Sequence, residues 1–126
     1  MIKWIGLIGL GSAIGGIARF IISYLTLSYQ YKNFPLGTFI VNVLGCFLMG
    51  ILFQMITGNL WSDSFKLFLL TGILGGFTTF SAFSFESIHL IQNNHYTIAL
   101  LYVTSSITIG LLSTWSGLVL MKSVLS

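Results

Sequence analysis

GILGGFTTFSAFSFE, residues 72–86, interrupts an otherwise apolar segment with small and hydroxyl-bearing residues. Each glycine costs a helix about 1 kcal/mol relative to alanine, and threonine loses side-chain freedom there, so Gly75-Gly76 followed by Thr78-Thr79 is a poor continuous helix. Inside a membrane, backbone groups without helical partners are tolerated only where they are buried in protein or line a wet cavity. The stretch therefore predicts a helix broken at membrane depth, which indicates an ion or substrate site.

The composition places the whole chain in a membrane. Of its 126 residues, 56% are hydrophobic and only 6% are charged, whereas a soluble domain carries about 25% charged residues. The five cations form no cluster, so no nucleic-acid partner is expected. The single cysteine, Cys46, cannot form an intrachain disulfide. We expect an all-α integral membrane protein in contact with lipid.

Four apolar runs are each long enough to cross about 30 Å of hydrocarbon at about 1.5 Å per residue. They are predicted to be transmembrane helices over residues 4–27, 36–57, 66–91 and 97–120. The connectors are short, so neighbouring helices should run antiparallel within a single domain of residues 1–126. Gly11 and Gly15 form a G-x-x-x-G face on the first run, which predicts close helix packing.

Two charged residues lie inside these runs. Arg19 either extends its charge to the membrane surface or provides a fixed positive charge in a water-filled vestibule, where it would concentrate anions. Glu86 is the only carboxylate within an apolar run, so it is either functional or close to the membrane surface.

Neutral polar side chains and aromatic rings share faces of the second and third runs. Thr38 and Asn42 are four residues apart, and the amide of Asn42 offers donors to an anion without a charge that would trap it. Asn42 could equally serve as a hydrogen-bond link between helices. Phe80 and Phe83 flank Ser81, and aromatic ring edges are electropositive, although such rings often only fill space.

The fourth run carries Tyr102, Ser106, Gly110 and Thr114 at four-residue spacing. These residues form one narrow polar stripe on a helix. Small residues that merely pack helices together would give a similar pattern.

The positive charges are nearly balanced across the predicted membrane. Lys3, Lys66 and Lys122 fall on one side, and Lys32 and Arg19 fall on the other. The positive-inside rule therefore gives no clear orientation, and the chain is expected to insert both ways. Dual insertion of so small a bundle favours an antiparallel two-fold dimer, in which the two broken helices could cross and share a cation.

Three motifs, in this order, resemble those of the fluoride-channel (Fluc, CrcB-like) family over essentially the whole chain. They are Gly11-x-x-x-Gly15-Gly16-x-x-Arg19-Phe20, Pro35-x-Gly37-Thr38-x-x-x-Asn42-x-x-Gly45 and Gly72-x-x-Gly75-Gly76-x-Thr78-Thr79-Phe80-Ser81-x-Phe83.

This resemblance implies a passive channel that exports cytoplasmic fluoride across the plasma membrane of a prokaryote and relieves fluoride toxicity. It implies an antiparallel dual-topology homodimer with two pores, or a heterodimer with a paralogue, and no enzymatic activity. A structural sodium ion would be held by main-chain oxygens at Gly75 and Thr78.

The resemblance also implies roles for individual side chains. The fluoride path would be lined by Asn42, Phe80, Phe83, Thr38, Ser81, Tyr102, Ser106 and Thr114, with Arg19 in the vestibule. The chain departs from the family at Ala82, often threonine, and at Gly110, a serine in some members, so each position lacks one donor.

Two other functions fit the same four-helix pattern. A small dual-topology multidrug exporter would exchange protons for a cation at a membrane carboxylate, for which only Glu86 is available. A packing subunit without transport of its own would use Asn42 and the phenylalanines only to hold helices together.

Overall fold

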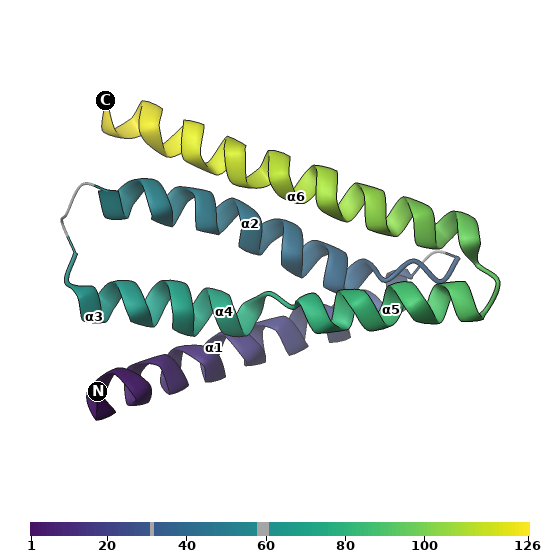
Figure 1. The fold of residues 1–126 in the computed structure, drawn as a ribbon, viewed down its shortest axis with the longest axis horizontal. Coiled ribbons are helices and arrows are strands. Elements are labelled where there is room, and N and C mark those ends of the chain that lie inside the picture. Colours follow the sequence, from purple (N-terminus) through teal and green to yellow (C-terminus); the bar gives the residue numbers. More distant parts are fainter. Residues whose placement is uncertain (31, 58–60) are drawn as a thin grey trace.

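The computed structural model describes residues 1–30, 32–57 and 61–126, and this part of the chain is helical. Its elements are α1 (Ile2–Thr26), η1 (Leu27–Tyr29), α2 (Leu36–Thr57), α3 (Asp63–Lys66), η2 (Leu67–Leu74), α4 (Gly75–Phe77), α5 (Phe80–Gln92) and α6 (Tyr96–Leu125). Elements α3 to α5 form one interrupted span (Figure 1). Within these ranges four spans are long and apolar enough to cross a membrane, as the sequence predicts.

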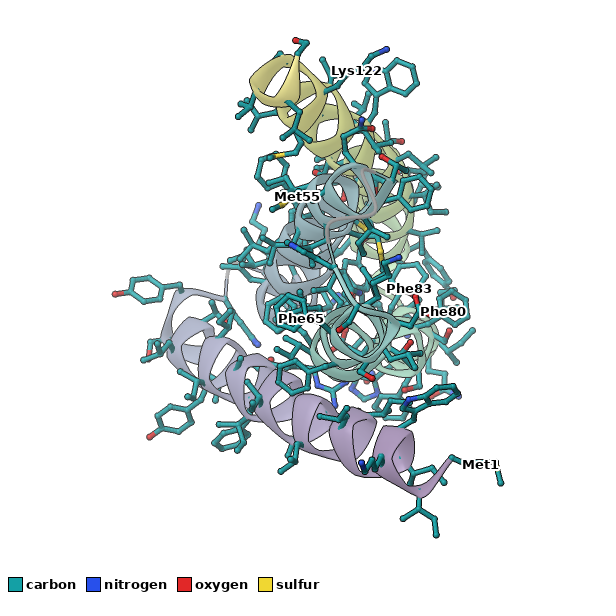
Figure 2. The ribbon with its side chains drawn as sticks, turned by 90° about the vertical axis from the view of Figure 1, so that its left-hand side faces the viewer. Met1, Met55, Phe65, Phe80, Phe83 and Lys122 are labelled. Atoms are coloured by element: carbon teal, nitrogen blue, oxygen red, sulfur yellow. The ribbon has the colours of Figure 1, made fainter. Side chains whose placement is uncertain are left out.

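The spans stack side by side, with both chain ends at the same end of the molecule (Figure 1). Seen end-on in Figure 2, α1 lies against the interrupted span, which is followed by α2 and then α6. The main packing partners are α2 with α6, and α1 with η2 and α4. Consecutive spans run antiparallel, as expected from the short connectors, but the most extensive packing joins the first span to the third and the second to the fourth, and these pairs run parallel.

Glycines bring α1 and the interrupted span into backbone contact. A Cβ atom added to Gly11 would lie 2.7 Å from the carbonyl oxygen of Phe68, and one added to Gly76 would lie 2.5 Å from that of Ser12. A Cβ at Gly15 would overlap the backbone of Ile73. The close packing predicted for the G-x-x-x-G face is confirmed, because no larger side chain fits between these helices.

The predicted break in the third span is present, but the paired glycines do not make it. Gly75 and Gly76 belong to α4, and the chain becomes extended at Thr78 (ψ 157°) and Thr79 (φ −150°, ψ 116°). Gly76 instead allows α4 to pack closely against α1, because a Cβ atom at this position would meet the backbone of Ser12. The sequence placed the break in a run of paired glycines and threonines, and within that run the interruption lies at the threonines, where the backbone finds side-chain partners instead.

Much apolar surface remains uncovered in the single chain. Phe80 is 79% exposed and Phe85 is 71% exposed, and many aliphatic side chains on α1 and α6 are also exposed. Such surfaces are compatible with a hydrocarbon solvent or with another copy of the chain.

Candidate functional site

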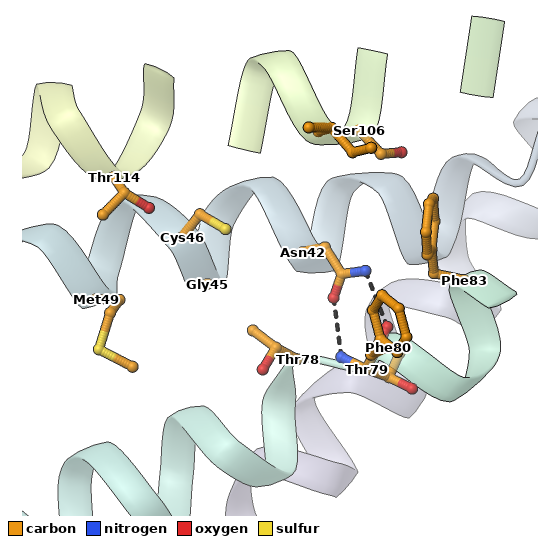
Figure 3. A pocket seen from close by; sticks show the side chains of 11 residues that line it. Asn42, Gly45, Cys46, Met49, Thr78, Thr79, Phe80, Phe83, Ser106 and Thr114 are labelled. Atoms are coloured by element: carbon orange, nitrogen blue, oxygen red, sulfur yellow. Dashed lines mark hydrogen bonds between the residues drawn. The ribbon is translucent and has the colours of Figure 1, made fainter. Parts of the chain in front are cut away.

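Asn42 holds the two halves of the interrupted span in place. Its Nδ2 donates to the carbonyl oxygen of Thr79 at 3.0 Å, and the Thr79 amide donates to Asn42 Oδ1 at 2.9 Å (Figure 3). One side chain thereby satisfies both backbone groups of the residue at the break. The hydrogen-bond link that the sequence left open for Asn42 is present, and its partner is backbone rather than a side chain.

The two threonines at the break replace the missing helical hydrogen bonds. Thr79 Oγ1 accepts from the amide of Ala82 at 3.2 Å and so caps the start of α5. Thr78 Oγ1 donates to the carbonyl oxygen of Leu74 at 3.0 Å at the end of α4. The side chains of the break are therefore used to terminate one helix and begin the next.

The side-chain hydrogen bonds at the break take up two backbone amides that would bond to backbone carbonyls in a continuous helix. In a continuous helix the Thr79 amide would bond to the carbonyl of Gly75, but it bonds to Asn42. Likewise the Ala82 amide would bond to the carbonyl of Thr78, but it bonds to the hydroxyl of Thr79. The carbonyls of Gly75 and Thr78, the main-chain oxygens expected to hold sodium, thus lose their helical donors, as do the other carbonyls of the last turn of α4.

A cavity of about 340 Å³ opens beside the break, between α2, α5 and α6. It is lined by Asn42, Gly45, Cys46, Met49, Thr78, Thr79, Phe80, Phe83, Ser106, Ile107 and Thr114 (Figure 3). We call this cavity the groove. Its wall is largely apolar, with a few polar groups from three different segments.

Five of the predicted pore residues meet in the groove: Asn42, Phe80, Phe83, Ser106 and Thr114. The two rings lie with their centroids 5.7 Å apart, tilted by 43°. The hydroxyl of Ser106 is buried and has no hydrogen-bond partner among the described residues. The hydroxyl of Thr114 donates to the carbonyl oxygen of Gly110 at 3.2 Å.

Thr38 and Tyr102 lie outside the groove and hold Glu86. Thr38 Oγ1 donates to Glu86 Oε1, and the Tyr102 hydroxyl donates to Glu86 Oε2, each at 2.7 Å. Tyr102 is fully buried, and its ring lies 5.3 Å from that of Phe83. The carboxylate cluster is therefore separated from the groove by the Phe83 and Tyr102 rings.

A second cavity of about 400 Å³ lies on the other side of Glu86, near the connectors. It is lined by Gln30, Asn33, Pro35, Glu86, His89, Leu90, Asn93 and His95. We call it the connector pocket. Groove, carboxylate cluster and connector pocket thus follow one another along the helices.

Five predicted site residues line neither cavity: Thr38 and Tyr102, which hold Glu86, together with Gly75, Ser81 and Arg19. Ser81 is exposed, and its hydroxyl is 3.4 Å from that of Thr79. Arg19 is partly buried on α1 and does not line the groove.

Sequence reasoning missed the part played by Thr79. A threonine three residues before Ala82 at the start of a helix is an N-cap signal, and this signal could have marked the break to within a residue. The partners of Glu86 were also missed. The spacing of Glu86 from Thr38 and Tyr102 in the sequence carries no signal that could have found them.

Known proteins similar to this chain identify its family. The chain matches the family described as CrcB-like protein, Camphor Resistance (CrcB), over residues 6–118. It is 42% identical over 123 residues to the fluoride-specific ion channel FluC of Flavobacterium psychrophilum, covering 97% of this chain and 99% of that one. It is 43% identical to the FluC protein of Azobacteroides pseudotrichonymphae (95% and 97% covered) and 38% identical to that of Helicobacter pylori (90% and 89% covered). The resemblance inferred from the motifs is confirmed: the chain is a multi-pass membrane protein that belongs to the CrcB/FluC family of fluoride-specific ion channels.

Proposed function

We propose that this chain is a passive, fluoride-selective channel that releases cytoplasmic fluoride through the bacterial plasma membrane. The observation that carries this proposal is the groove beside the interrupted helix, where neutral donors and two phenylalanine rings come together. The curated relatives are channels rather than enzymes, and they match nearly the full length of the chain.

The chemistry of the groove suits a small, strongly hydrated anion. Asn42 uses one amide N–H on Thr79, which leaves its second N–H for a ligand. Ser106 adds a buried hydroxyl that has no hydrogen-bond partner in the described part of the chain, and Phe80 and Phe83 add electropositive ring edges. None of these groups carries a full charge, so an anion could be bound in place of water and still leave.

We propose that the path continues from the groove past Phe83 to the carboxylate cluster and out through the connector pocket. Thr38 and Tyr102 each have a hydroxyl at this depth, now donated to Glu86. These hydroxyls would serve as further donors along the path. Ser81 and Thr114 are proposed as polar lining at its margins, and Arg19 as the charge that attracts anions to the vestibule.

Sodium fits the carbonyls at the break. Within the described residues no group of three or more His, Cys, Asp or Glu side chains could hold a metal ion, so backbone oxygens are the available ligands. The carbonyls of Gly75 and Thr78 have lost their helical donors, as described above. When bound, the ion would supply positive charge that compensates these oxygens, and two copies of the chain would complete its ligand set.

We further propose that the working unit is an antiparallel homodimer. A 79% exposed Phe80 at the edge of the groove leaves the site open on one side. A second copy would close it, and would bring the second interrupted helix to the shared sodium ion. A heterodimer with a paralogue would cover the same exposed surface, and it is the alternative to the homodimer.

The proposal is tested with purified protein in liposomes loaded with potassium fluoride, using a fluoride electrode and valinomycin to carry the compensating potassium. Fast fluoride release without a proton gradient is expected, with chloride-loaded vesicles as the control. Vesicles that retain fluoride as well as protein-free ones would refute the channel. Phe80→Ile and Asn42→Ala should both abolish release; if they changed only protein stability, the packing-subunit interpretation would replace the channel.

One observation keeps the proton-coupled exporter as a second candidate. Glu86 is held within the spans and borders a cavity of its own, as an exchanging carboxylate would. Coupling to protons would make the direction of transport depend on the pH gradient. A passive channel depends only on the fluoride gradient and the voltage, so the reversal potential distinguishes them.

A further inference from the structure

The connector pocket concentrates titratable groups that the proposed pore residues leave unused. Among the residues that line it, Glu86 is acidic, and His89 and His95 are the only histidines of the whole sequence. Histidine is the side chain that changes charge between about pH 5 and pH 8. The connector pocket, one mouth of the proposed path, therefore holds two side chains of the type that changes charge in the range of pH that a bacterium meets.

His95 is held in the pocket by a contact between two connectors. The amide Nδ2 of Asn33, before α2, lies 2.9 Å from His95 Nε2, before α6. An amide nitrogen donates, so Nε2 accepts and the ring in this geometry is neutral. Lys32 (φ 47°), Asn33 (φ 65°) and Asn94 (φ 61°) are the non-glycine residues with positive φ in the part of the chain that the structure describes, and all three flank this contact. Positive φ is costly for such residues, and it marks connectors whose geometry is imposed by what they hold together.

His95 can gain a proton without losing this hydrogen bond. A protonated imidazole donates from both nitrogens, so the Asn33 amide needs only to turn over and present its oxygen. In the described hydrogen bonds the Asn33 amide has this one partner, and turning it over breaks no other bond.

His89 has a different arrangement and provides a matched control. Asn93 Nδ2 lies 3.2 Å from His89 Nε2 but also donates to the carbonyl oxygen of His89 at 2.8 Å. Turning this amide over would break its hydrogen bond to the carbonyl oxygen of His89. With the amide left in place, a proton on Nε2 would face the N–H group of Asn93, so two donors would point at each other. The His89 ring is also exposed and stacks on Phe85, with centroids 5.8 Å apart.

We propose that His95, held by Asn33 beside Glu86, sets the charge at this mouth of the fluoride path, so that acidification increases fluoride conduction. This inference rests on the proposed channel function. One added positive charge several ångströms from an anion in a water-like dielectric raises the anion's local concentration about two- to threefold. A cell in acid surroundings, where HF enters fastest, would thereby release fluoride faster.

Other titratable groups lie in or near the pocket. Glu86 is the acidic group that lines the pocket, and a proton bound there would change the charge in the same direction as one bound to His95. The other titratable side chains nearby, Lys32 and the tyrosines Tyr29, Tyr96 and Tyr102, are of residue types that do not change charge in this range. Only replacement of His95 therefore separates its contribution from that of Glu86.

The test is single-channel recording of the full-length protein in planar bilayers with equal, subsaturating fluoride on both sides, from about pH 8 to about pH 5.5. Current reports the anion, because neutral HF carries none. Wild type should rise about two- to threefold over this range. His95→Gln should remove most of the rise and His89→Gln should retain it, while His95→Lys should give the acid-level current throughout.

The outcomes separate this inference from the function on which it rests. A wild-type channel that conducts fluoride equally at all pH values, or a His95→Gln variant that keeps the full response, overturns the inference but leaves the channel intact. A response removed by His89→Gln alone also overturns it. No fluoride current at any pH would refute the channel itself, and this inference with it.

Discussion

Replacing Asn42 with alanine should destabilise the protein as well as block conduction. The change removes both hydrogen bonds, of 3.0 and 2.9 Å, that satisfy the carbonyl and the amide of Thr79. A buried polar group left without its partner costs about 1–3 kcal/mol, although hydrogen bonds between membrane helices average only about 0.6 kcal/mol. Two such bonds therefore give a loss of about 2 kcal/mol in the free energy of unfolding.

The assay is unfolding in mixed micelles with increasing SDS, followed by circular dichroism, alongside fluoride release from liposomes. Ser106→Ala is the matched control, because the Ser106 hydroxyl lies in the same groove without a hydrogen-bond partner among the described residues. It should reduce fluoride release while leaving the free energy of unfolding unchanged within about 0.5 kcal/mol.

Asn42→Asp adds a second comparison at the same position. A carboxylate can still accept from the Thr79 amide but cannot donate to its carbonyl, and it adds a negative charge to the groove. It should abolish fluoride release through repulsion of the anion. An Asn42→Ala variant as stable as wild type, within about 0.5 kcal/mol, would refute the argument that this side chain satisfies the break.

Three further predictions concern packing, the ion and the coupling. Gly15→Ala should lose about 2 kcal/mol of stability in the same unfolding assay, because the added Cβ would overlap the backbone of Ile73. Gly16→Ala is the control and should be neutral, because the space around Gly16 is open. Equal effects of the two changes would contradict the proposed helix contact. Purification with N-methylglucamine in place of sodium should dissociate the dimer, measured by light scattering, and restored sodium should reverse this; a dimer indifferent to sodium would exclude a structural ion. Under an imposed pH gradient, the reversal potential of the Glu86→Gln current should still be set by the fluoride gradient alone. A wild-type reversal potential that depends on the pH gradient would favour the exporter.

Much of the architecture follows from composition and spacing. Runs of apolar residues with so few charges can only be placed in hydrocarbon, and hydrocarbon requires their backbones to be helical. The G-x-x-x-G pattern at Gly11 and Gly15 was likewise sufficient to predict close packing, because only residues without side chains allow two backbones to touch. The site residues Asn42, Phe80 and Phe83 share the groove beside the break that the sequence located approximately.

The sequence by itself determined that this chain crosses the membrane on four helices, that the third is interrupted, and that it belongs to the fluoride channels, since these depend on residue types and their spacing along the chain. Only the tertiary structure decided which groups partner the backbone at the break and what each polar side chain bonds to. The break lies at Thr78 and Thr79 rather than at the glycines, because Asn42 on another helix supplies the missing hydrogen bonds there. Thr38 and Tyr102 likewise hold Glu86 from separate helices. Such partners are distant in sequence, and a backbone group in hydrocarbon takes whichever donor or acceptor the packing brings within reach.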